Sequence, residues 1–120
     1  MIKKPETVVI DNLQGGKGHA IINHIISKEE LSGSGKMYAE VVLEPGCSIG
    51  WHQHVDETEP YYILEGEGIF TDNDKSRTIV HPGDVCTIKP GQWHSIENNS
   101  ESQNLSFMAL IYYTNCTRPE

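Results

Sequence analysis

Short apolar segments alternate with turn-forming clusters along the chain. The segments are rich in residues that favour β-strands. Clusters such as QGGKG at 14–18 and HPGD at 81–84 separate them, because Gly, Pro and Asp favour turns. The segments predicted to be strands are 19–26, 37–43, 61–66, 68–72, 77–80, 84–88, 93–98 and 105–113.

Short strands at regular spacing predict an all-β sandwich or barrel. The segment DNDK at 72–75 predicts a hairpin turn between two of these strands. The one helical candidate is SKEEL at 27–31, a single turn at most, in which Ser27 and Glu30 have the spacing of a capping box.

The chain has 120 residues, the size of one ordinary domain, and contains neither a repeat nor a linker. We therefore expect a single domain over residues 1–120. Its core barrel is predicted at about 36–113, preceded by an N-terminal strand segment at about 7–26. An exposed edge strand at 7–10 or 19–26 favours pairing between two copies, so a homodimer is expected.

Charge and cysteine content narrow the possible partners. Nine Lys and Arg residues stand against 17 Asp and Glu residues, and the net charge of −8 disfavours nucleic acid and anionic membranes. Neither a signal peptide nor a membrane-spanning apolar run is expected. The chain has an odd number of cysteines, and these lie far apart in sequence: Cys47, Cys86 and Cys116. This pattern indicates reduced thiols in a cytoplasmic protein.

The segment WHQHVDETEP at 51–60 contains the candidate chemistry. His52 and His54 are two residues apart, so their side chains share one face of a strand. A hairpin through VDET at 55–58 could bring Glu59 beside them, and two imidazoles with a carboxylate form a facial ligand set for a divalent metal. His94, which opens a strand after a Pro-Gly turn, is the best candidate for a fourth ligand.

For the other histidines, acidic residues, cysteines and tryptophans, structural or solvent-exposed positions are favoured over roles in a site. His19 and His24 are five apart, so they face opposite sides of a strand and are expected at the surface or core edge. His81 is expected in a solvated turn. Solvated loop positions are expected for Asp56 and Glu57, buried positions for Cys47 and Cys86, and positions facing away from the metal for Trp51 and Trp93.

Two spaced motifs give the chain a family resemblance. The first runs Gly46, His52, His54, Glu59 and Gly66, and the second runs Gly83, Gly91, His94 and Asn98. At these spacings the chain resembles the cupin superfamily, specifically a small single-domain metal-binding cupin of the cupin 2 type. One departure is that Lys89 stands at the usual proline position, with Pro90 next to it.

The resemblance implies a double-stranded β-helix, also called a jelly-roll barrel. It also implies a metal held by His52, His54, Glu59 and His94. Three nitrogens and one carboxylate oxygen suit a divalent first-row metal, with Mn or Fe favoured and Ni, Co, Cu or Zn also compatible. Such a centre leaves adjacent positions open for a small oxygen-rich ligand such as a carboxylate, a keto-acid or a sugar.

Three functions are compatible with this resemblance. The first is an enzyme, which would be a metal-dependent oxidoreductase, decarboxylase or isomerase; oxalate decarboxylase-like and dioxygenase-type cupins belong here. The second is a non-catalytic metal-dependent binding or sensor module, and the third is a barrel with a structural metal. The sequence identifies no catalytic residue, but Tyr61 and Tyr38 are candidates for a position beside the metal ligands. No lid that could carry a proton-donating acid is evident, which disfavours oxalate decarboxylation but leaves the binding of a diacid open.

Overall fold

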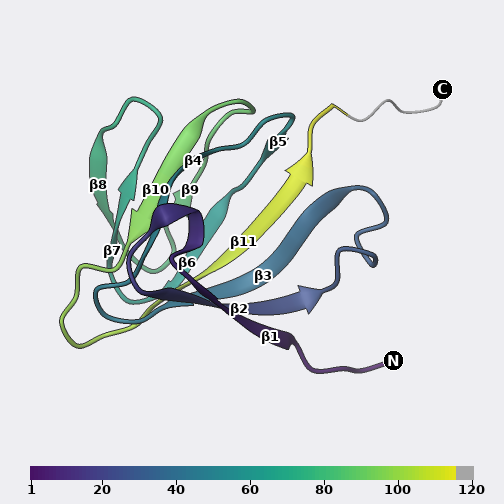
Figure 1. The fold of residues 1–120 in the computed structure, drawn as a ribbon, viewed down its shortest axis with the longest axis horizontal. Helices are drawn as coiled ribbons and strands as arrows, with labels where there is room; N and C mark the ends of the chain where they lie inside the picture. The colour runs from purple at the N-terminus through teal and green to yellow at the C-terminus, as the bar shows by residue number, and fades with distance from the viewer. Residues whose placement is uncertain (116–120) are drawn as a thin grey trace.

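Two antiparallel β-sheets face each other in the computed structural model, which describes residues 1–115 (Figure 1). The larger sheet has the strand order β1-β2-β3-β11-β6-β9, with β5 pairing with β11. The smaller sheet has the order β4-β10-β7-β8. In chain order the elements are β1 (Glu6–Asp11), the 3-10 turn η1 (Leu13–Gly15), β2 (His19–Ile26), β3 (Gly35–Leu43), β4 (Ser48–Gln53), β5 (Glu57–Thr58), β6 (Tyr61–Glu65), β7 (Gly68–Thr71), β8 (Arg77–Val80), β9 (Val85–Cys86), β10 (Trp93–Glu97) and β11 (Leu105–Tyr113).

The core lies between the sheets and follows the period of two that strands impose. In β3, Ala39, Val41 and Leu43 are at most 1% exposed, while the residues between them are only half-buried. The smaller sheet contributes Ile49, Phe70, Val80 and Ile96, all buried. Alternation therefore turns one face of each sheet toward the other, and the all-β, double-stranded β-helix prediction is confirmed.

Several local predictions are confirmed in detail. The strands predicted at 19–26, 77–80 and 105–113 coincide residue for residue with β2, β8 and β11. The hairpin turn between β7 and β8 is closed by the Lys75 amide, which donates to the Asp72 carbonyl oxygen at 2.8 Å. Ser27 and Glu30 make both hydrogen bonds of a capping box, at 2.9 and 3.1 Å, but they close a turn and no helix follows.

The hairpin predicted through 55–58 is wrong. β4 pairs with β10 in the smaller sheet, whereas β5 pairs with β11 in the larger one, so this segment crosses between the sheets. The chain turns at Asp56, which has a left-handed φ of 58°. The crossing places Glu59 on the sheet opposite the histidines, where it approaches them across the interior.

The one helical element within residues 1–115 is the short 3-10 turn η1. Of the segments that the structure describes, none forms a helix long and apolar enough to cross a membrane.

Candidate metal centre

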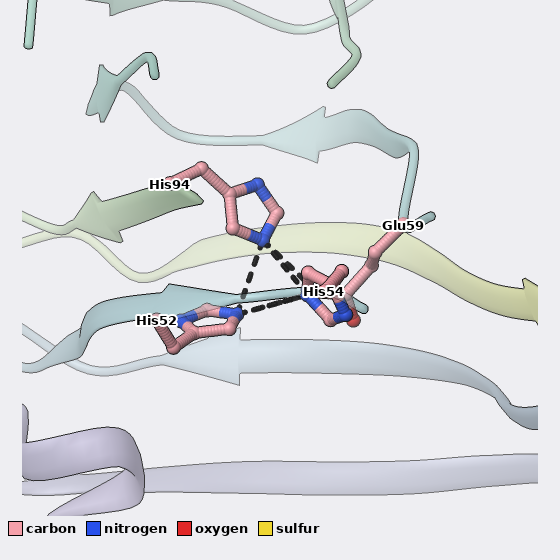
Figure 2. Close-up of side chains that lie close together, drawn as sticks. All are labelled: His52, His54, Glu59 and His94. Carbon is pink, nitrogen blue, oxygen red and sulfur yellow. Dashed lines mark hydrogen bonds and ion pairs between the residues drawn. The ribbon is translucent and has the colours of Figure 1, made fainter. Parts of the chain in front are cut away.

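Four buried side chains from both sheets converge in the barrel interior (Figure 2). His52 on β4 and His94 on β10 are direct cross-strand partners. His54 follows the end of β4, and Glu59 follows β5 on the larger sheet. All four are at most 7% exposed. We refer to His52, His54, Glu59 and His94 as the His–Glu cluster.

The ligand-type atoms of the cluster surround one point. The three Nε2 atoms lie 3.1 Å from one another. Oε1 of Glu59 lies 3.1 Å from Nε2 of His54, 3.3 Å from that of His94 and 3.7 Å from that of His52. Nitrogens at this separation are spaced as neighbouring ligands of one ion with bonds of about 2.0–2.2 Å.

Hydrogen bonds on the far side of two rings orient them. Nδ1 of His52 donates to the carbonyl oxygen of Gly50 at 2.6 Å, because a carbonyl can only accept. Nδ1 of His54 donates to a carboxylate oxygen of Glu57 at 2.5 Å. Neutral rings that carry hydrogen on Nδ1 present a lone pair at Nε2, so both rings aim a metal-binding lone pair at the centre.

His94 is held by packing. Its Nδ1 is buried and has no hydrogen-bond partner within the described residues. The ring stacks on Tyr61 at a centroid distance of 5.0 Å and meets Phe70 edge-on at 5.8 Å. The aromatic contacts fix the plane of the ring, which turns Nε2 toward the cluster.

Glu57 is the main functional residue that sequence reasoning missed. It was expected in a solvated loop, but it is 5% exposed. One oxygen accepts from His54, and the other lies 2.6 Å from Nζ of Lys36 on β3. The one signal in the sequence was spacing: Glu57 is two residues from Glu59, so in a strand both side chains lie on the same face.

The ionisation of the cluster suits a cation. Burial raises the pKa of Glu59, but the contacts with the three imidazoles outweigh burial and bring the pKa well below its usual value. Burial lowers the pKa of His94, which keeps its imidazole neutral. Burial also lowers the pKa of His54, but the adjacent Glu59 and Glu57 carboxylates outweigh it and raise the pKa, which marks a basic nitrogen.

These residues fit a divalent transition metal. Lone pairs from His52 and His54 and the charge of Glu59 point at one buried centre, an arrangement that a bound cation would stabilise. Neutral imidazoles and a carboxylate are the ligands that first-row metals prefer. Ligand chemistry, orientation and spacing therefore agree.

The two tyrosines proposed near the ligands lie in different places. Tyr61 is 1% exposed, and its hydroxyl donates to Oε1 of Glu59 at 3.0 Å. Burial and then the Glu59 charge raise its pKa well above the usual value, so the hydroxyl remains a donor. Tyr38 lies instead in a shallow apolar hollow with Tyr62 and Met108, so the structure does not bring it to the cluster. Tyr38 is displaced because the residues before and after it, Met37 and Ala39, take the inward positions of β3.

A cavity of about 140 Å³ adjoins the cluster. Its size is close to that of a protein cavity of about 150 Å³ that accepts benzene, so a ligand of six heavy atoms fits. Apart from the cluster and Tyr61, its walls are mostly apolar: Ile10, Leu13, Ile22, Met37, Val41, Ile49 and Ile111. Gln14 and His24 also line it, and His24 is half-buried, which agrees with the core-edge position expected for it.

The remaining candidates lie away from the cluster. His19 bonds to Glu44 at 2.5 Å near the surface, and His81 is exposed. Trp51 and Trp93 stack on each other at 6.0 Å, and neither lines the cavity. The free thiols of Cys47 and Cys86 are buried, as expected, and Cys116 lies outside the described residues.

Comparisons with known proteins agree with this geometry. A model of the family described as "Cupin domain" matches residues 39–111. The chain is 45% identical over 102 residues to an oxalate-binding protein from Thermotoga maritima, covering 85% of this chain and 83% of the relative. A crystal structure of a predicted oxalate decarboxylase from Thermotoga maritima superimposes with a TM-score of 0.86 at 38% identity, covering 94% of this chain and 98% of the other. A cupin 2 conserved barrel domain protein from Salinispora arenicola shares the fold, with a TM-score of 0.69 at 22% identity and coverage of 93% and 88%. The motifs, the barrel and these matches together show that the chain belongs to the cupin domain family.

Proposed function

We propose that the His–Glu cluster holds one divalent transition metal ion and that a small dicarboxylate, with oxalate as the leading candidate, binds beside it in the cavity. The observation that carries this proposal is the convergence of three Nε2 atoms and one carboxylate oxygen beside a mostly apolar cavity. The similarity to an oxalate-binding protein supports the choice of ligand class.

The metal would supply positive charge and open coordination positions that attract carboxylate oxygens. Mn or Fe is favoured, since no thiolate belongs to the cluster. The protein residues provide the preorganisation. Gly50 and Glu57 fix two rings, and the Tyr61 hydroxyl fixes the Glu59 carboxylate. The apolar walls limit water, which strengthens electrostatic attraction within the cavity.

The cavity lining favours binding over decarboxylation. Replacing a carboxylate on carbon by hydrogen requires a proton donor close to that carbon. Among the described residues that line the cavity, Glu59 is the one carboxylic acid, and it belongs to the cluster. The Tyr61 hydroxyl is engaged by Glu59 and has a raised pKa, so it is a poor acid. His24 also lines the cavity, but it is half-buried toward the rim and lies outside the cluster, so we propose a binding protein for the diacid.

Isothermal titration calorimetry of oxalate tests this function. We expect one oxalate to bind per metal-loaded chain, with little binding to metal-free protein or to His54→Ala. Formation of formate or carbon dioxide from oxalate is expected to stay at background. Oxalate binding that is equally strong without metal would overturn the proposal.

A further inference from the structure

Two residues with polar side chains, Gln14 and His24, line the cavity without belonging to the cluster. We propose that Gln14 and His24 bind the end of the dicarboxylate that is remote from the cluster, and that they select diacids over monocarboxylates. This inference rests on the proposed function and adds the residues that determine its specificity. It follows from the lining of the cavity, the position of each residue and the needs of a second carboxylate.

The cavity lining leaves few groups for a second carboxylate. Seven apolar residues form most of the wall. Tyr61 already donates its hydroxyl to Glu59 at 3.0 Å. Within the described part of the chain, Gln14 and His24 are thus the lining side chains that have a hydrogen-bond donor outside the cluster and its tyrosine.

His24 belongs to the inward-facing row of β2. Ala20 is fully buried, Ile22 is 2% exposed and His24 is half-buried, so the row leads from the core toward the rim of the cavity. His24 pairs with Ala39 on β3 and with Glu6 on β1. No side chain among residues 1–115 hydrogen-bonds to its ring, which leaves the nitrogens available to a ligand.

Gln14 lies on the η1 turn, which packs onto β4, the strand that carries His52 (Figure 1). The Ser48 amide donates to the Lys17 carbonyl oxygen at 2.9 Å, and the Lys17 amide donates to the Ser48 hydroxyl at the same distance. The turn and the strand also approach closely at Gly50, where a Cβ would lie 2.1 Å from the Gln14 carbonyl oxygen. Gln14 is exposed but lines the cavity, so it is held at the mouth.

A diacid needs donors at both ends. One carboxylate of the diacid would face the positive charge of the metal ion held by the cluster. The oxygens of the second carboxylate would meet the apolar walls. A buried carboxylate oxygen without a donor is strongly unfavourable. The amide of Gln14 offers two N–H donors and the imidazole of His24 at least one. A monocarboxylate instead turns hydrocarbon toward the apolar wall and needs neither residue.

The test compares two ligands and one metal by calorimetry. Oxalate and acetate are titrated into Mn-loaded wild type, His24→Leu and Gln14→Leu, and Mn is titrated into the metal-free proteins. We expect each variant to bind oxalate about tenfold more weakly. Acetate and Mn affinities are expected to stay within twofold of wild type. His24→Gln keeps a donor and is expected to restore most of the oxalate affinity.

His19→Leu is the matched control, because it replaces a histidine on the same strand that bonds to Glu44 away from the cavity. If both leucine variants bind oxalate as tightly as wild type does, this inference is wrong and the proposed function stands. Parallel loss of Mn or acetate affinity would show a structural role and overturn it as well. Wild type that binds Mn but no oxalate would overturn the proposed function and this inference together.

Discussion

Replacement of Glu57 by glutamine isolates the hydrogen bond that orients His54. The carboxylate accepts from Nδ1 of His54 at 2.5 Å and lies 2.6 Å from Nζ of Lys36. The amide of Glu57→Gln has nearly the same shape and still accepts a hydrogen bond, but it lacks the charge. Its effect on metal binding therefore measures what the charged partner contributes.

The structure sets the expected magnitude. Hydrogen bonds to a charged group contribute about 1.5–3 kcal/mol, against about 0.5–1.5 kcal/mol for neutral ones, so the change loses about 1–1.5 kcal/mol. That loss is roughly tenfold in metal affinity. Glu57→Leu removes the acceptor altogether and leaves Nδ1 of His54 buried without a partner. For that variant we expect a loss toward the upper end of the roughly 10–100-fold range typical of such partners.

Calorimetric titration of Mn into metal-free protein measures both variants. Glu44→Gln is the matched control, because Glu44 also bonds to a histidine at 2.5 Å, but His19 and Glu44 are partly exposed and lie outside the cluster. We expect unchanged metal affinity in the control. Metal affinity within twofold of wild type in both Glu57 variants would refute the role assigned to Glu57.

Three further predictions concern the loop, the metal and the edge strand. Gly50→Ala places a Cβ against the Gln14 backbone, so urea unfolding should show a loss of about 1–3 kcal/mol, and a loss near zero would contradict the observed contact. Metal at about 100 times its Kd should add about 2.7 kcal/mol of stability, so a chelator should lower Tm by on the order of 10 °C, and an unchanged Tm would count against the site. We predict that two copies of the chain pair through the free edge of β1 to form a homodimer, because Val8, Val9 and Ile10 on this edge strand are 39%, 58% and 36% exposed. Light scattering at micromolar concentration should give twice the chain mass for wild type and the chain mass for Val9→Lys, and a monomeric wild type would refute the pairing.

The strands and the ligand-type residues could be predicted from the sequence because local rules determine them. Turn-forming clusters bounded the apolar segments that form β2 and β11, and the two-residue spacing of His52 and His54 indicated a shared face. Tyr61 was a candidate for a position beside the ligands and is two residues from Glu59, and its hydroxyl bonds to that carboxylate.

Contacts between distant segments could not be predicted in this way. Glu57 is buried because β5, only two residues long, pairs with β11, and because Lys36 on β3 reaches it. An acidic residue in a turn-like segment is usually solvated, so the local signal was misleading. His24 lines the cavity because β2 packs with its even-numbered residues inward. The packing of β2 against the neighbouring strands determines this orientation, and the histidine itself does not.

The most direct test of the metal centre is the metal content of untagged protein purified without added metal, measured by elemental mass spectrometry beside a folded His54→Ala variant. The arrangement of the His–Glu cluster predicts about one divalent transition metal ion per wild-type chain and a large loss in the variant. Wild-type protein that contains no metal and takes none up on titration with Mn, Fe or Zn would contradict the account.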